Sequence, residues 1–254
     1  KPNKKGMEEV QHKFKVSAFR AVDEPNLCLQ YIKGHVKVLT DYGISNITSN
    51  NNLWINNPNI YCLGLHSESN ELMAGIRIQL ADGTNPLPIE KAIGHMDNTI
   101  YGLVEKYAIN GGIGELSGLW VDNRLKGMAI GWYMVRAAIA SSNQLNFKTM
   151  IGICGDVTLK MFNNVGFTIE KRLGKNGQFY YPKEDLIAHA VGILNAVTLD
   201  NAIEYDKKIM QSLRNEIHQK RIESDTKIKV GIEYNLKYPK IVKVLYNKNL
   251  ETIK

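Results

Sequence analysis

Hydrophobic residues recur at helical spacing in several stretches of the chain, and each stretch predicts a helix. The first stretch, residues 22–43, begins with Asp23 and Pro25 and ends at Gly43, which are typical helix boundaries. The other stretches span residues 87–112, 128–142, 155–167 and 199–222. Residues 87–112 carry one continuous apolar face, formed by Ile89, Ile93, Met96, Ile100, Leu103 and Tyr107. That face predicts one long helix packed on the core.

Short apolar runs bounded by turn residues predict strands between these helices. Residues 60–80 and 168–181 each predict a β-hairpin, the second with its turn at Asn176-Gly177. Single strands are predicted at residues 113–121, 149–154 and 227–236, and a polar loop at residues 45–52. This order of elements predicts an α/β (α+β) fold in which helices flank a mixed sheet.

Composition places the chain among ordinary globular proteins. It has 254 residues, 44% of them hydrophobic and 22% charged. Cys28, Cys62 and Cys154 are far apart in the sequence and form no C-x-x-C pair. We therefore expect a reducing, cytoplasmic location and no thiolate metal site. The first residue is Lys rather than Met, so we expect a trimmed or mature fragment.

Charge and hydropathy narrow the set of partners. The formal net charge is +7, but the lysines are dispersed and the densest tracts lie near the termini. We therefore expect no nucleic-acid partner, although a phosphate-rich cofactor would need only a local cluster. No apolar run approaches the roughly 18 residues of a membrane span, and the N-terminal stretch has no apolar signal region. We expect no membrane partner.

The stretch "VDNRLKGMAIGWYM", residues 121–134, joins a predicted strand to a predicted helix. Main-chain N–H groups at a helix start can hold a phosphate if small residues let it approach. Gly127, Ala129 and Gly131 supply small residues at alternate positions, yet neither G-x-x-x-x-G-K-[ST] nor G-x-G-x-x-G is present. From these residues alone, a phosphate cradle and plain helix–sheet packing remain equal alternatives.

Two motifs resemble those of the GNAT superfamily of N-acyltransferases. "VDNRLKGMAIG" aligns without a gap with the family's V-D-P-x-Y-R-G-x-G-I-G, with Lys126 at the usual Arg and Ala129 at a usual Gly. "FNNVGF" aligns with Tyr-x-x-x-Gly-Phe and has Phe162 in place of the Tyr. The resemblance covers residues 14–182 as an acyl-CoA-binding domain. Residues 183–254 are then expected to be a C-terminal helical and strand extension that acts as a lid, dimer arm or acceptor platform.

The resemblance implies a mostly antiparallel sheet and an acyl-coenzyme A donor, carrying acetyl or another acyl group. The main chain of Leu119, Trp120 and Val121 would bind the pantetheine amides. The pyrophosphate would bind at the loop formed by Lys126, Gly127, Met128, Ala129, Ile130 and Gly131. A shorter form of the motif also fits Arg124, Gly127 and Ala129.

For catalysis, the resemblance points to Glu115 as general base in transfer to a small-molecule or peptide amine. "ELSGLWV" is similar to the E-L-S-R-L-x-V strand of the N-acyl amino acid synthase group, with Gly118 in place of Arg. The alternative for Glu115 is a strand-end carboxylate paired with Lys or Arg.

The general acid remains open in the sequence, because Phe162 has no proton to give. Tyr180, Tyr181 and Ser117 are candidates, unless the thiolate leaves unaided. A non-catalytic acyl-CoA-binding module is the alternative to an enzyme. His66 and His95 are lone histidines of the kind that is usually structural, and no spacing predicts a metal site. A homodimer is compatible with the narrow apolar stripe of residues 199–222.

Overall fold

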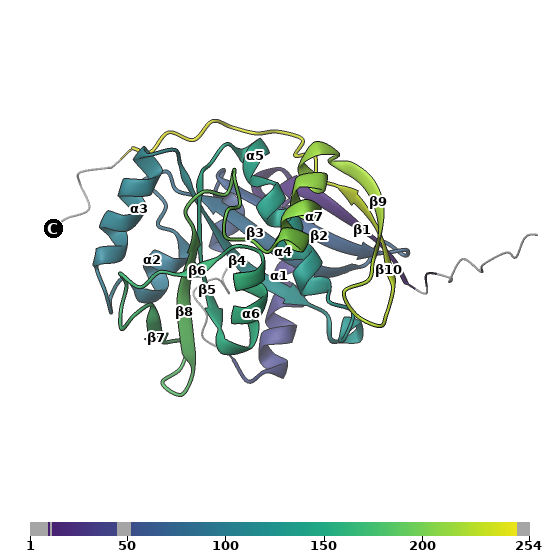
Figure 1. Cartoon of the computed structure of the whole chain (residues 1–254), viewed down its shortest axis with the longest axis horizontal. Coiled ribbons are helices and arrows are strands. Elements are labelled where there is room, and N and C mark those ends of the chain that lie inside the picture. The colour runs from purple at the N-terminus through teal and green to yellow at the C-terminus, as the bar shows by residue number, and fades with distance from the viewer. Residues whose placement is uncertain (1–9, 11, 45–51, 248–254) are drawn as a thin grey trace, which may run out of the picture.

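The computed structural model describes residue 10, residues 12–44 and residues 52–247, and its strands form one mixed sheet (Figure 1). The sheet order is β6-β8-β5-β4-β3-β2-β1-β10-β9, with β7 also paired to β8. β1 runs parallel to β10 and β4 runs parallel to β5, while the other neighbours are antiparallel. The strands are β1 (His12–Arg20), β2 (Ile60–Ser67), β3 (Leu72–Leu80), β4 (Ile113–Val121), β5 (Thr149–Gly155), β6 (Thr168–Ile169), β7 (Gln178–Tyr180), β8 (Ile187–Ile193), β9 (His218–Glu223) and β10 (Val230–Asn235). The predicted fold class, a mostly antiparallel mixed sheet flanked by helices, is confirmed.

Helices cover both faces of this sheet (Figure 1). Their bounds are α1 (Pro25–Asp41), α2 (Pro88–Ile93), α3 (Thr99–Ile109), α4 (Ile130–Ala140), α5 (Ser142–Leu145), α6 (Asp156–Asn164) and α7 (Glu204–Asn215), with 3-10 turns η1 (Ala21–Asp23), η2 (Leu53–Asn56) and η3 (Asn123–Leu125). Alternation along the strands divides the core. Ile113 packs in the cluster that includes α2 and α3, whereas Leu116 packs in the cluster that includes α4. The central strand β4 therefore contributes to both layers.

The single long helix predicted for residues 87–112 is wrong, because the segment forms α2 and α3 with a break between them. Asp97 lies in the break, where its carboxylate accepts hydrogen bonds from the N–H of Thr99 at 3.0 Å and of Gly174 at 2.7 Å. Met96, predicted on the apolar face, is 42% exposed. The helix stops because Asp97 bonds a distant loop as well as its own following turn.

The hairpin predicted for residues 168–181 is also wrong, although its turn is present. Asn176 and Gly177 have φ of 55° and 86°, the left-handed conformation that the prediction required. However, β6 and β7 do not pair with each other as strands. Both pair antiparallel with β8 and form one interrupted edge. The sequence pattern had not revealed β8, which supplies that common partner.

The C-terminal third joins the same sheet. The helix predicted for residues 199–222 ends at Asn215, and residues 218–223 form edge strand β9 instead. Strand β10 lies where residues 227–236 predicted one, and it pairs with β1, a strand that the apolar pattern had not indicated. Strands from both sides of residue 182 share this one sheet. The division of the chain into two domains at that residue stays a prediction.

A buried ion network anchors the C-terminal third to α4. The guanidinium of Arg136 is 2.5 Å from Asp206 of α7 and 2.7 Å from Asp225 in the β9–β10 loop. Arg136 and Asp206 are almost fully buried, and Trp132 also donates its indole N–H to Asp206 at 3.1 Å. Removing one partner of such a network leaves a buried charge uncompensated, so α7 is held in register on α4.

Several smaller expectations have mixed outcomes. Helix α1 begins with Pro25 as predicted, but Asp23 makes no capping bond to it, and Tyr42 is exposed. The predicted polar loop at residues 45–52 falls, except for its last residue, outside the described residues. Within the described ranges, no helix combines the length and apolar character of a membrane span. The same residues contain no cluster of three or more His, Cys, Asp or Glu side chains suited to a metal ion.

Candidate functional site

The site begins where two parallel strands separate. β4 and β5 pair only from Ile113 to Glu115 on β4 and from Thr149 to Ile151 on β5. On its other side β4 stays paired with β3, but the register shifts between Gly75 and Arg77. This shift is a bulge in β4 at Gly118 and Leu119, and bulges bend the strand that carries them. The bend leads the second half of β4 away from β5 and opens a gap in the sheet.

Gly118 is the residue that makes this bulge possible. Its φ is +61°, and an added Cβ would lie 2.8 Å from Nε of Arg77. Its carbonyl accepts a hydrogen bond from the Tyr31 hydroxyl of α1. A side chain would therefore be strained and crowded at this position. A Gly at position 118 avoids both problems in this chain.

The loop after β4 has two residues in the left-handed conformation and open space at Gly127. Gly127 has φ +85° with nothing near the Cβ position, and Ala129, the residue before α4, has φ +55°. The carbonyl of Ala129 accepts the first helical bonds, from the N–H of Trp132 and Tyr133. The N–H groups of Ile130 and Gly131 precede those bonds and lie at the positive end of the helix dipole.

Ala129 explains one departure from the family motif. A left-handed conformation favours Gly, and an Ala there costs on the order of 1 kcal/mol. The main chain of Ala129 nevertheless adopts it, at φ +55° and ψ +22°. Ala129 thus adopts the left-handed conformation that a Gly would adopt without this cost.

Arg124, the alternative anchor of the shorter motif, is engaged elsewhere. Its guanidinium binds Asp122 at 2.8 Å and Glu71 at 2.6 Å. The bond from the Arg124 guanidinium lowers the pKa of Asp122 to about 2, and Asp122 also accepts the N–H of Arg124 at the start of η3. Lys126 is exposed at the loop itself. Arg124 is thus engaged in ion pairs, whereas Lys126 is exposed, and the register of the motif stays a prediction.

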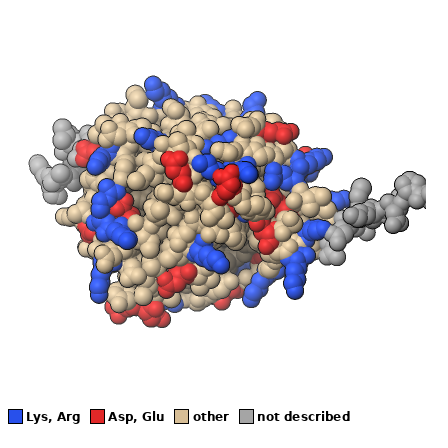
Figure 2. Space-filling view, in the orientation of Figure 1, with Lys and Arg blue, Asp and Glu red and all other residues tan. Residues whose placement is uncertain are grey.

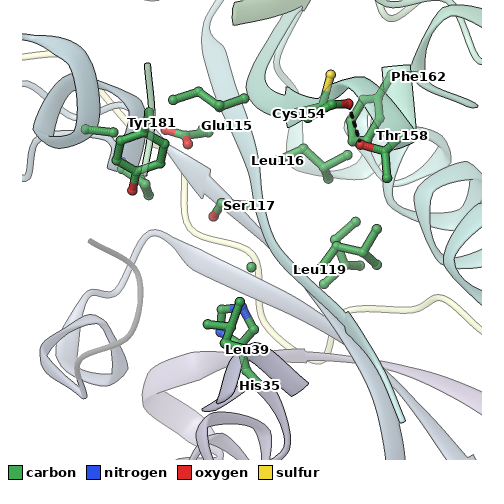
Figure 3. Close-up of a pocket in the computed structure, with 16 residues that line it drawn as sticks. His35, Leu39, Glu115, Leu116, Ser117, Leu119, Cys154, Thr158, Phe162 and Tyr181 are labelled. Carbon is green, nitrogen blue, oxygen red and sulfur yellow. Dashed lines mark hydrogen bonds between the residues drawn. The ribbon is translucent and has the colours of Figure 1, made fainter. Parts of the chain in front are cut away.

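A cleft of about 260 Å³ occupies the gap between the strands (Figure 3). In Figure 3, Glu115 and Tyr181 lie towards one side, and Cys154, Thr158 and Phe162 towards the other. Ser117 and Leu119 lie between these groups and α1. The lining comprises His35, Leu39, Ile76, Pro88, Ala92, Glu115, Leu116, Ser117, Gly118, Leu119, Ile153, Cys154, Gly155, Thr158, Phe162 and Tyr181. The gap thus brings the catalytic candidate and one end of the predicted cofactor strand into one cavity.

Glu115 is a buried acid on the wall of this cleft. It is 3% exposed, and its Oε2 accepts the N–H of Ile89 at the start of α2 at 2.7 Å. The pKa of Glu115 is raised to about 8, chiefly by burial and also by the nearby Glu90 carboxylate, while the Ile89 bond opposes the rise. None of the ion pairs among the described residues includes Glu115, in contrast to the alternative of a Lys or Arg pair.

The three residues predicted to bind pantetheine have different environments. Leu119 lines the cleft. Trp120 is buried towards α1, where its ring meets Tyr31 edge-on at 5.9 Å and fills the space left by Gly34 and Gly75. Its side chain thus anchors the strand, and only main-chain groups remain for a ligand. Val121 is half-buried and faces the start of α4 beside Gly131.

The candidates for general acid are now distinguishable by position. Tyr180 is 68% exposed and does not line the cleft, whereas Tyr181 and Ser117 do. Phe162 lies in the cleft wall, and its ring meets Phe167 edge-on at 5.0 Å. Cys154 also lines the cleft, where burial and the Asp156 carboxylate raise the pKa of the thiol to about 12. Cys154 is therefore an un-ionised thiol at neutral pH.

One cleft residue, His35, had no functional assignment in the sequence. It lies on the buried face of α1 and lines the cleft, and burial together with Arg77 lowers its pKa to about 4. The only sequence signal was its place in the helical stripe of α1, which is equally typical of a core residue. His66 pairs with Lys15 in the sheet and His95 lies between α2 and α3, and neither lines the cleft.

Acidic and basic side chains mix over the surface. Figure 2 shows Lys and Arg interspersed with Asp and Glu on the face that it presents. This agrees with the dispersed lysines of the sequence.

Solved structures share this architecture. An N-acyl amino acid synthase from uncultured soil microbes, FeeM, matches with a TM-score of 0.55 at 14% identity, over 70% of this chain and 97% of that one. A CoA-dependent acyl-homoserine lactone synthase, BjaI, solved with SAM and isopentyl-CoA, matches with a TM-score of 0.53 at 12% identity, over 87% and 95%. An acyl-CoA N-acyltransferase from Pseudomonas aeruginosa matches with a TM-score of 0.50 at 9% identity, over 71% and 99%.

No protein-family model matches the chain, and no curated protein matches it either. At these sequence identities the structural matches establish the fold. The protein has a GNAT-like fold, as the two motifs predicted.

Proposed function

We propose that this protein is an N-acyltransferase that moves an acyl group from acyl-coenzyme A directly to an amine in a ternary complex. One observation carries the proposal: a buried carboxylate, Glu115, lines the cleft that opens where β4 leaves β5. The known structures of similar fold include acyl-CoA-dependent enzymes, which supports the same donor here. The three cysteines are free and buried, in line with our proposal of a reducing, cytoplasmic location.

The loop and the strand fit coenzyme A by their chemistry. The N–H groups of Gly127, Ala129, Ile130 and Gly131 would hold the pyrophosphate, with Lys126 adding a positive charge. The N–H groups of Lys126 and Met128 instead donate to the carbonyls of Asn123 and Leu125 within the loop. Gly127 leaves open space where a side chain would obstruct the phosphate. Past Glu115, the β5-facing edge of β4 has no strand partner within the described ranges. Apart from the Gly118 carbonyl, which accepts the Tyr31 hydroxyl, its main-chain groups would bind pantetheine amides. Such bonds replace water that those amides lose in the cleft.

The thioester of acyl-coenzyme A supplies an activated carbonyl. The protein must then accept a proton from the amine and allow the departing thiolate to be protonated. An ammonium group is not a nucleophile until it loses a proton. Glu115, whose pKa is about 8, can accept that proton when ionised and is poised close to physiological pH. The resulting neutral amine forms the new C–N bond. Its nitrogen then loses a second proton, which leaves to solvent, as the C–S bond breaks and the thiolate departs. The buried position of Glu115 keeps competing water away from the carboxylate.

Protonation of the departing thiolate falls to another group, because Phe162 has no acidic proton. Tyr181 and Ser117 line the same cleft and remain the candidates for this role. A thiolate is also a tolerable leaving group without help, since a thiol has a pKa near 8.5.

The second candidate function is an acyl-CoA-binding module without turnover, and Phe162 is the observation that favours it. The two functions are separated by measuring coenzyme A binding in calorimetry and thiol release with acetyl-CoA or butyryl-CoA. The amine panel contains amino acids, alkylamines and arylalkylamines, polyamines, aminoglycosides and peptides. Thiol release that depends on an amine supports the enzyme. Binding without release for every amine contradicts it.

The cradle itself is tested with Gly127→Trp, which fills the open space at the loop. We expect coenzyme A binding to be lost in a variant whose circular dichroism is unchanged. Gly102→Trp is the control, because Gly102 lies on α3 and also has open space around it. Unchanged affinity in a folded Gly127→Trp variant would place the phosphate site elsewhere.

A further inference from the structure

The wall of the cleft contains almost no charge. Of the lining residues in the described part of the chain, Glu115 is the only acid, and none is Lys or Arg. His35 is neutral above a pKa of about 4, and Cys154 is an un-ionised thiol. The walls near α1 and α2 add apolar surface from Leu39, Pro88 and Ala92.

We propose that the acceptor is a primary amine with an apolar body and no carboxylate beside its amino group. This inference rests on the proposed N-acyltransferase function and specifies its substrate class. An alkylamine or arylalkylamine has this chemistry, whereas a free α-amino acid does not.

The first reason is charge balance. An ammonium group beside an ionised Glu115 makes a neutral pair, so the cleft gains one cation for its one anion. An α-amino acid brings a carboxylate as well, which leaves one net negative charge in a cavity with an apolar lining. Burying an unpaired carboxylate is costly, and a second anion would also repel Glu115.

The second reason is that no cation lies in the described cleft lining. Lys91 of α2 acts on Glu115 by charge alone and is exposed outside that lining. Arg77 is 2% exposed and lies behind Gly118, with its guanidinium 4.3 Å from the centroid of the Trp54 ring. Lys183 lies outside the cleft lining, and its ammonium donates to the carbonyl of Gly43 after α1. None of the lining residues that the structure describes is thus a cation that could pair with a carboxylate.

The third reason is the arrangement on the Glu115 side. Figure 3 shows Leu39 and His35 of α1 across the cleft from Glu115 and Tyr181, with Ser117 between them. A short apolar body can lie among Leu39, Pro88 and Ala92 while the amino group reaches Glu115. The polar groups there are neutral, so they can orient an amine by hydrogen bonds without demanding a charged substituent.

The test uses pairs of amines that differ only by a carboxylate. The pairs are phenethylamine with L-phenylalanine, and 3-methylbutylamine with L-leucine. L-phenylalaninamide is added because it keeps the substituent but removes its charge. Wild-type protein receives acetyl-CoA or butyryl-CoA, and both thiol release and acylated amine are measured. We expect kcat/KM for at least one decarboxylated amine to exceed that of its amino acid on the order of 100-fold, with the amide closer to the amine.

A cation placed in the wall sharpens the test. Leu39→Arg should raise kcat/KM for the amino acid, because the new cation can pair with its carboxylate. The ratio of kcat/KM for the amine to that for its amino acid should therefore fall at least about tenfold. Amino acids that react as well as their decarboxylated partners would overturn this inference and leave the N-acyltransferase intact. Coenzyme A binding without thiol release for any amine would instead overturn the proposed function, and the inference with it.

Discussion

The two halves of β4 differ although they form one strand. From Ile113 to Glu115 the strand pairs on both sides, and Glu115 is held in a dry position against α2. Beyond the bulge at Gly118 it pairs only with β3 in the described structure, and most of its residues are half-buried. The first half can therefore raise the pKa of a carboxylic acid by burying it, whereas the second half has main-chain groups that a ligand could bind. A single glycine bulge separates these two tasks.

Glu115→Gln should have the largest effect, because it removes the proposed base and keeps the shape of the first half. We expect kcat to fall on the order of 1,000-fold, with coenzyme A affinity within about threefold of wild type. Steady-state thiol release and calorimetry measure the two quantities. Glu68→Gln, in the exposed turn between β2 and β3, is the control and should change neither. Unaltered turnover in Glu115→Gln would remove Glu115 from the mechanism.

The burial of Glu115 also predicts how stability depends on pH. Its folded pKa of about 8 lies above the ordinary value of 4.5, so between these values the folded state holds the proton more tightly. Stability from this group is therefore fully present below about pH 4.5 and is lost as pH rises through about 8, by a few kcal/mol. Urea midpoints from pH 5 to 9 measure the decline.

Two variants isolate that decline. Glu115→Gln should flatten it. In Glu90→Gln the loss of stability should be complete at a lower pH than in wild type, because the Glu90 carboxylate is the like charge that raises the pKa of Glu115. The other charged groups around Glu115 are Arg77 and Lys91, and both lower its pKa. The same decline in wild type and Glu115→Gln would mean that another group causes it.

Gly118→Val should damage the second half of β4 more than the first. A Val at φ +61° is strained, and its Cβ would collide with Arg77, so we expect a loss of about 3 kcal/mol of stability. Coenzyme A affinity should fall in the fraction that still folds, because the bulge sets the path of β4. Gly102→Val on α3, with open space around it, is the matched control. Denaturant unfolding measures the stability of both variants, and calorimetry measures their coenzyme A affinity. Equal losses in Gly118→Val and Gly102→Val would contradict a special role for the bulge.

Phe162→Tyr should have the smallest effect of these variants, and it should increase kcat rather than decrease it. A hydroxyl in the cleft wall could protonate the leaving thiolate, so we expect kcat to rise by less than about tenfold. Phe167→Tyr is the control, since Phe167 is 1% exposed and packs against the same ring without lining the cleft. A fall in kcat for Phe162→Tyr at unchanged coenzyme A affinity would show that no acid is needed there.

The local elements of the site could be predicted from sequence because their signals are local. The run of residues 113–121, the small residues from Gly127 to Gly131 and the apolar face of α4 each lie within one short window. The break between α2 and α3 could not, because Asp97 bonds Gly174, a residue 77 positions away. The two short strands β6 and β7 looked like a hairpin because their common partner, β8, follows both of them in sequence.

Which residues line the cleft also depends on tertiary packing, which no short stretch of sequence reveals. Tyr180 and Tyr181 are adjacent, and only the position where β7 ends decides that Tyr181 lines the cleft. His35 lines it because α1 packs against β3 and β4, where Gly34 and Gly75 allow close contact with Trp120. Glu115 was recognisable as a candidate, but its bond to Ile89 comes from a helix start far along the chain.

The most direct test of the central claim is a product balance on wild-type protein. Acetyl-CoA and phenethylamine are incubated with the protein, and free thiol and acetylated amine are quantified together by absorbance and mass spectrometry. We predict one acetylated amine per thiol released, at a rate that depends on Glu115. Tight coenzyme A binding with no acylated product, for this amine and for the full panel, would contradict the account.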